Sequence, residues 1–274
     1  MPKLRLAGHP MYYMDRGKGT PVVLLHSYLA NAFMWTPQVQ ALETRYRVIV
    51  PDLWGHGSSG ALPEGTHDLS ALTRHVAALI DSLDLETYVV AGQSVGGMMA
   101  GELALSSPTR VKGLIMMGTY LGQEPAKPQD YFMRLLDRID ADGTFTPALL
   151  DEITALFFQS DVSGATPSLK ASFQRQLLSW SMETLRQSIL PIGRMIFQRR
   201  DLCSRLHELS STPTLVMCGE HDRVRPTSES VDMAQRIGCR YIEVPGASHT
   251  SNLEQPEFVT RAWLGFLAER EARA

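Results

Sequence analysis

The sequence predicts an α/β fold, in which a mostly parallel sheet of eight strands carries helices on both faces. Two observations support this prediction: short apolar runs alternate with segments of helical periodicity, and one long stretch between the sixth and seventh strands contains helix formers without a clear buried strand. A chain of 274 residues can form one large domain or two small ones.

Eight segments have the character of strands. The first two form a predicted β-hairpin within residues 1–17, with Gly8-His9-Pro10 at the turn. The other six are short apolar or β-prone runs, which suit strands buried in a parallel sheet. They are Val22–His26, Arg47–Pro51, Tyr88–Ala91, Val111–Met117, Thr214–Cys218 and Arg240–Val244.

Helices are expected between these strands. The second of them shows the clearest periodicity, because its apolar residues recur at the spacing of one helical face. Those residues are Leu72, Val76, Leu79, Ile80 and Leu83. The expected helices are Phe33–Glu43, Leu69–Leu83, Gly97–Ser106, Ser228–Ile237 and Glu257–Glu269.

Residues 121–205 interrupt the alternation of strands and helices. The sequence therefore predicts a core formed by residues 1–120 and 206–274, with a helical cap of residues 121–205 packed on it. Aromatic and soft apolar side chains are numerous in the cap, and the sequence does not tell which of them line a pocket and which pack between helices. They are Phe132, Phe145, Phe157, Phe158, Trp180, Met182, Met195 and Phe197.

Gly92-Gln93-Ser94-Val95-Gly96 fits the Gly-x-Ser-x-Gly pattern of a nucleophile elbow. It lies between an apolar, β-prone run and a helical segment, which is the context that the pattern requires. The flanking glycines allow the tight turn, and the helix N-terminus behind the serine favours developing negative charge. The plainer alternative is an ordinary turn serine, but a nucleophilic Ser94 needs a base and an orienting acid, and the sequence offers both.

The acid and the histidine are expected to follow the serine in that order. Asp222 ends the segment Gly219-Glu220-His221-Asp222 that follows the strand Thr214–Cys218, and His249 ends the segment that follows the strand Arg240–Val244. Both residues would then lie at the carboxyl ends of strands, where open α/β sheets place their sites. Glu220 is the rival acid, and Asp222 is preferred because it lies further into the loop.

The oxyanion of an acyl-transfer reaction needs donors that are already aimed at it. The backbone N–H of Val95, the residue after the nucleophile, is one predicted donor, and the backbone N–H of Tyr28, in the loop His26-Ser27-Tyr28, is the other. His26 is expected to brace this loop rather than to catalyse, and Asp52 is expected to support the turn Gly55–Ser58.

Several segments together resemble the α/β-hydrolase superfamily, in particular its capped esterase, lactonase and C–C hydrolase branch. The resemblance spans nearly the whole chain apart from the cap. The family usually has Gly after the first histidine, where this chain has Ser27, and a Cβ there narrows the freedom of the loop. The matching segments are His26-Ser27-Tyr28, Asp52-Leu53-Trp54-Gly55-His56-Gly57-Ser58, Gly92–Gly96, Gly219-Glu220-His221-Asp222, Gly246-Ala247-Ser248-His249 and Leu253-Glu254-Gln255-Pro256-Glu257.

The resemblance implies hydrolysis of a small-to-medium carboxylic ester or lactone through an acyl-enzyme on Ser94. Relatives that act as haloalkane dehalogenases or epoxide hydrolases carry Asp at the nucleophile position, so Ser94 argues against both. A C–C bond hydrolase of ring-cleavage diketones and a slow-turnover ligand-sensing protein would keep the same triad and stay open as alternatives. No metal or organic cofactor is needed for this chemistry.

Composition limits the other classes of function. A formal net charge of −3 gives no electrostatic case for nucleic acid or an anionic membrane as partner, and no apolar run is long enough to span a membrane. The first residues have no apolar core of signal-peptide length, so we expect a cytoplasmic protein with a small-molecule substrate. The oligomeric state stays open.

Arg194, Arg199 and Arg200 are candidates for binding a substrate carboxylate, although a solvated helix end is the plainer interpretation of these arginines.

Overall fold

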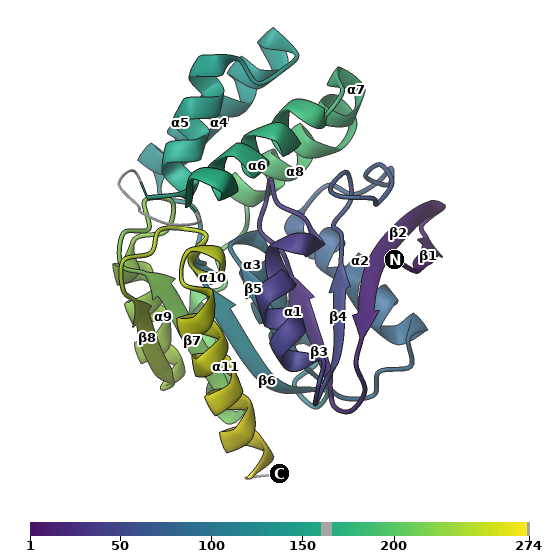
Figure 1. Ribbon diagram of the computed structural model, residues 1–274, viewed down its shortest axis with the longest axis vertical. Helices are drawn as coiled ribbons and strands as arrows, with labels where there is room; N and C mark the ends of the chain where they lie inside the picture. The colour runs from purple at the N-terminus through teal and green to yellow at the C-terminus, as the bar shows by residue number, and fades with distance from the viewer. Residues whose placement is uncertain (160–165, 273–274) are drawn as a thin grey trace.

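The computed structural model describes residues 1–159 and 166–272, which form a sheet with helices on both faces and a group of helices above the ends of its central strands (Figure 1). The sheet has eight strands in the order β1-β2-β4-β3-β5-β6-β7-β8. The first two pairings, β1 with β2 and β2 with β4, are antiparallel, and all the others are parallel. The strands are β1 (Lys3–Leu6), β2 (His9–Arg16), β3 (Pro21–Leu25), β4 (Arg47–Pro51), β5 (Tyr88–Gln93), β6 (Val111–Met117), β7 (Thr214–Gly219) and β8 (Arg240–Val244). The predicted fold class is confirmed.

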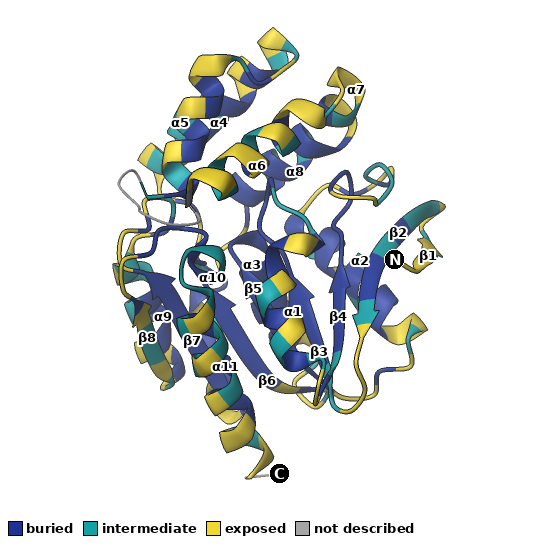
Figure 2. Ribbon diagram, in the orientation of Figure 1, coloured by how far each residue is buried: buried dark blue, intermediate teal, exposed yellow. Residues whose placement is uncertain are grey.

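The sheet separates two hydrophobic cores because successive side chains of a strand point to opposite faces. Along β5, Tyr88 and Val90 belong to one core, whereas Val89 and Ala91 belong to the other. The first core receives α2 (Leu69–Ser82), α3 (Val95–Ser106) and α9 (Thr227–Ile237). The second receives α1 (Thr36–Leu42) and α11 (Pro256–Glu271). Figure 2 shows the central strands buried between these layers.

Two local predictions differ from the structure. The hairpin turns at Ala7-Gly8, both with positive φ, so His9 and Pro10 already belong to β2. A two-residue turn of this hand matches the twist of the paired strands. The segment predicted as one helix from Phe33 splits into a 3₁₀ turn at Ala32–Trp35, capped by Asn31, and α1, which begins at Thr36 with Pro37 in its first turn.

The helices between β6 and β7 form a separate layer above the carboxyl ends of the strands (Figure 1). We call them the inserted helices. They are α4 (Ala126–Asp142), α5 (Pro147–Phe157), α6 (Thr166–Ser179), α7 (Met182–Thr184), a π-helical turn (Leu185–Ile189) and α8 (Leu190–Phe197). After the inserted helices, the chain returns to β7 through a 3₁₀ segment, Cys203–Ser211. Near the end of the chain, a short helix, α10 (Ser251–Glu254), precedes α11. The predicted cap boundaries, 121 and 205, stay a prediction, and its residues 160–165 lie outside the described residues.

Candidate active site

Ser94 occupies a strained turn between β5 and α3. Its φ of 55° and ψ of −121° are rare for a residue with a side chain, and such strain persists only when the surroundings fix it. Here the Ser94 N–H donates to the Met117 carbonyl over 2.9 Å, and the Thr119 hydroxyl donates to the Ser94 carbonyl over 2.7 Å. A Cβ on Gly92 would collide with the Gly96 carbonyl, and one on Gly96 would collide with the Leu25 carbonyl. Both glycines of the motif are therefore required by close backbone approach.

Asp222 and His249 meet as the sequence predicts. His249 Nδ1 lies 2.8 Å from Asp222 Oδ2, and both side chains are fully buried. The other oxygen, Oδ1, accepts the backbone N–H groups of Val224 and Arg225 over 2.9 and 2.8 Å. The carboxylate is thus held at both oxygens and presents Oδ2 to the imidazole. Glu220, the rival acid, is exposed and accepts the Gly246 N–H over 2.9 Å instead.

Ser94 and His249 line the same pocket. Because Asp222 accepts from Nδ1, the other ring nitrogen of His249 is left as the acceptor, and Nε2 has no hydrogen-bond partner among the described residues. The hydrogen bond between the Ser94 hydroxyl and Nε2 is therefore not formed in this structure. Such contacts are often loose in the absence of substrate. Phe157 packs edge-on against the imidazole, with ring centroids 5.2 Å apart.

Two neutral histidines hold the loop that contains Tyr28. His26 Nδ1 donates to the Ser27 carbonyl over 2.7 Å, and its Nε2 accepts the Leu53 N–H over 2.8 Å. His56 donates from Nδ1 to the Trp54 carbonyl and accepts the Leu29 N–H on Nε2. Burial lowers the pKa of His26 to about 4 and that of His56 to about 3, so each ring keeps one donor and one acceptor. His26 braces this loop, as predicted.

Asp52 links the loop that follows β3 to the Gly55–Ser58 turn. Its Oδ1 accepts the Ala32 N–H over 2.8 Å, and its Oδ2 accepts the Ser58 N–H over 2.9 Å. The prediction that Asp52 supports the Gly55–Ser58 turn is confirmed.

The predicted oxyanion donors are the backbone N–H groups of Val95 and Tyr28. Val95 is the first residue of α3, so its N–H has no acceptor one turn earlier within the helix. Tyr28 lines the pocket with Ser94, and its hydroxyl donates to the Ile189 carbonyl over 2.8 Å. This hydrogen bond links the Tyr28 side chain to the π-helical turn of the inserted helices. The role of the two N–H groups stays a prediction.

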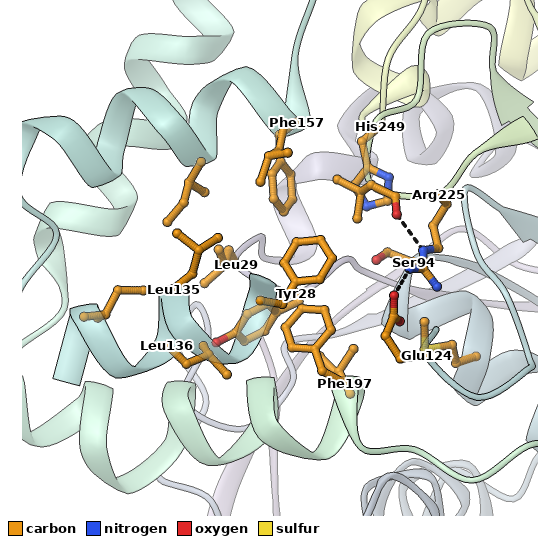
Figure 3. A pocket seen from close by; sticks show the side chains of 17 residues that line it. Tyr28, Leu29, Ser94, Glu124, Leu135, Leu136, Phe157, Phe197, Arg225 and His249 are labelled. Atoms are coloured by element: carbon orange, nitrogen blue, oxygen red, sulfur yellow. Dashed lines mark hydrogen bonds and ion pairs between the residues drawn. The ribbon is translucent and has the colours of Figure 1, made fainter. Parts of the chain in front are cut away.

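The pocket lies between the carboxyl ends of the strands and the inserted helices (Figure 3). Its empty volume is about 640 Å³, open mouth included. Of the aromatic side chains in the predicted cap, Phe132, Phe157 and Phe197 line it, and Phe132 stacks on Phe197 at 4.3 Å between ring centroids. Met98, which the sequence suggests is a core residue, also lines the pocket. The remaining apolar walls are Leu29, Leu135, Leu136, Ile139, Ile153, Leu156, Ile196 and Val224.

Charged side chains also reach this pocket, and the sequence did not identify them. Glu124 and Arg225 line it beside Ser94 and His249 (Figure 3). Arg199 is 5% exposed and pairs with Glu124, so its interpretation as part of a solvated helix end is wrong. Arg194 and Arg200 are at the surface, where they pair with Asp137 and Glu102. Arg225 lies between Val224 and Pro226 in the loop that carries the predicted acid. This position near Asp222 is the one feature of the local sequence that could have pointed to it.

Within residues 1–159 and 166–272, no group of His, Cys, Asp or Glu side chains has the arrangement of a metal site. No helix in this part of the chain is both long and apolar enough to cross a membrane. The predicted cytoplasmic location and the absence of nucleic-acid partners stay predictions.

Comparisons with known proteins agree with the fold. A family model described as alpha/beta hydrolase fold matches residues 20–256. The chain is 27% identical to 3-oxoadipate enol-lactonase 1 of Acinetobacter baylyi over 90% of this chain and 88% of that protein. It is 28% identical to 2-hydroxymuconate semialdehyde hydrolase of Pseudomonas putida, over 97% and 93% of the two chains. A malate-bound thermophilic esterase from Thermogutta terrifontis superposes with a TM-score of 0.87 at 27% identity, covering 98% of this chain and 99% of that one. With its match to the family model over most of its length, the chain belongs to the α/β-hydrolase family.

Proposed function

We propose that this protein is a serine hydrolase that cleaves a small-to-medium carboxylic ester or lactone through an acyl-enzyme. The supporting observation is the buried hydrogen bond between Asp222 and His249, which directs the free Nε2 to the pocket that Ser94 lines. Esterase and enol-lactonase activities among the similar proteins agree with this choice.

In the proposed reaction, a rotation of the Ser94 side chain brings its hydroxyl to His249 Nε2. The imidazole takes the proton as Ser94 Oγ attacks the carbonyl carbon of the substrate, and the backbone N–H groups of Val95 and Tyr28 stabilise the oxyanion. His249 then protonates the leaving oxygen, and the acyl-enzyme forms. A water molecule gives its proton to His249 and attacks the acyl carbon. His249 then returns that proton to Ser94 Oγ as the acyl bond breaks, which restores Ser94 and releases the acid. Asp222 stabilises the imidazolium at each step.

The inserted helices act as a cap in this proposal. Residues of α4, α5 and α8 provide most of the pocket wall, and nearly all of that wall is apolar. An apolar, enclosed pocket strengthens the electrostatic contacts at the oxyanion and limits the size of the acyl or alcohol group.

The proposal is tested by steady-state hydrolysis of p-nitrophenyl esters from acetate to decanoate. Wild-type turnover should show an optimum in chain length and vanish in Ser94→Ala. Ser106→Ala, at the exposed far end of the same helix, is the matched control and should keep wild-type rates. Equal rates in wild type and Ser94→Ala would overturn the proposal.

A C–C bond hydrolase of ring-cleavage diketones is the second candidate, because of the similarity to 2-hydroxymuconate semialdehyde hydrolase. The same triad would serve, so a substrate panel separates the two. Turnover of a ring-cleavage diketone at a kcat/KM well above that for any ester or lactone would favour it. A single turnover followed by tight retention of ligand would instead indicate a ligand-sensing protein.

A further inference from the structure

Three buried charged side chains form an ion cluster next to the proposed nucleophile. Glu124 accepts Arg199 Nη1 on Oε2 over 2.6 Å and Arg225 Nη2 on Oε1. The side chains of both arginines are 3% exposed, and that of Glu124 is fully buried. Glu124 and Arg225 line the pocket together with Ser94 and His249 (Figure 3), whereas Arg199 is not among the lining residues. Burying charge is costly unless it is paired, so the balance within this cluster matters.

The cluster contains more hydrogen-bond donors than Glu124 satisfies. Glu124 provides one negative charge for two guanidinium groups. The next carboxylate, Glu229, lies 3.4 Å from Arg225 Nε, but that nitrogen donates to the Val224 carbonyl, and Glu229 Oε2 has no hydrogen-bond partner among the described residues. Among the described residues, Arg225 Nη1 and Arg199 Nε and Nη2 are buried without a hydrogen-bond partner. A buried cation with unused donors is suited to binding an anion.

The Arg225 side chain is held in place before any ligand arrives. Its Nε donates to the Val224 carbonyl over 2.7 Å, and its backbone N–H donates to Asp222. Its partner Glu124 precedes α4, and Arg199 follows α8, so both ends of the inserted helices meet at this cluster. A guanidinium fixed in this way loses little conformational freedom when it binds a carboxylate.

We propose that Arg225, held by Glu124, binds a carboxylate of the substrate. The preferred substrates would then be short esters or lactones that carry a free carboxylate, such as monoesters of short dicarboxylic acids, rather than neutral esters. The scissile carbonyl lies at Ser94, the carboxylate lies at Arg225, and the apolar side chains of α4, α5 and α8 contact the remainder. This inference rests on the proposed function and specifies its substrate class.

The test compares p-nitrophenyl hydrogen glutarate with p-nitrophenyl valerate, in which a methyl group replaces the carboxylate. We expect wild-type kcat/KM to favour the glutarate ester by about 10- to 100-fold, as one charge-assisted contact allows. In Arg225→Met this preference should disappear. The matched control is Arg223→Met, the same substitution at an exposed position in the same loop, and it should keep the preference.

Arg225→Met keeps the buried Glu124–Arg199 pair but leaves Glu229 without the cation beside it, which destabilises the fold. The double variant Arg225→Met/Glu229→Gln removes both charges of that second contact and should fold, with the same loss of preference. Free glutarate should also inhibit hydrolysis of the valerate ester by the wild type competitively, which needs no variant.

The outcomes separate the two proposals. Ser94-dependent turnover with no preference for the glutarate ester, or a preference that survives in the double variant, would overturn the carboxylate site and leave the serine hydrolase intact. If no ester is hydrolysed, the proposed function fails. Calorimetric titration of glutarate into wild type and the double variant then tests the carboxylate site at Arg225 independently of turnover. Binding lost in the double variant supports it, and equal or absent binding refutes it.

Discussion

Asp222→Asn replaces one side-chain oxygen with an NH₂ group and so tests the proposed roles of Asp222 and His249. Asp222 Oδ1 accepts two backbone N–H groups, from Val224 and Arg225, whereas Oδ2 accepts a hydrogen bond from His249 Nδ1 and a long one from the Cys218 thiol. An asparagine keeps its oxygen at the first position, since an amide NH₂ group there would face two donors. Its NH₂ group must therefore point at His249 Nδ1 and donate to it.

That donation reverses the tautomer of His249. Nδ1 becomes the acceptor, so the proton moves to Nε2, which then cannot accept the proton of Ser94. A wrong tautomer of this kind lowers kcat by about 10⁴-fold, which corresponds to about 5 kcal/mol in the activation free energy. The fold should survive, because both backbone hydrogen bonds to the side-chain oxygen remain.

The assay is kcat for the best p-nitrophenyl ester, with the melting temperature as a measure of folding. Glu220→Gln is the control, because this exposed rival acid contacts Gly246 rather than His249, and it should retain wild-type kcat within a few-fold. A folded Asp222→Asn variant with kcat within about 10-fold of wild type would refute the assignment of Asp222 as the orienting acid.

Two further predictions concern stability and protonation. Gly96→Ala should lower the free energy of unfolding by about 1–3 kcal/mol or more, because the new Cβ meets the Leu25 carbonyl, which is backbone and cannot move aside. Gly265→Ala, in open space within α11, should be neutral or stabilising in the same urea titration, and equal stability of the two variants would contradict the packing argument. The ring of His26 should remain neutral by NMR until the pH nears its pKa of about 4, whereas titration near 6.5 would show that it is not buried as described. Since this pKa is below the unfolded value, the contribution of His26 to stability is complete above pH 6.5 and is lost as the pH falls towards 4.

The sequence alone determined the order of strands and helices and the residues of the predicted triad. These features are local: a β-prone run, a glycine-flanked serine and the start of a helix lie within a few residues, as do the strand ends before Asp222 and His249. Steric limits on a tight turn and the periodicity of buried faces act over such distances, so the pattern is readable without the fold.

Tertiary structure alone decided which side chains form the pocket and where its charge lies. Glu124 meets Arg199 and Arg225 across 75 and 101 residues of sequence, so no local pattern marks the cluster. Arg199 follows a helix end, as a solvated arginine would, yet it is buried and paired with Glu124, which lies just before α4. In the same way, Phe132, Phe157 and Phe197 have the composition of ordinary core residues, and only the packing of the inserted helices over the sheet turns them towards Ser94. Burial and charge pairing depend on contacts between distant segments, and such contacts exist only once the chain has folded.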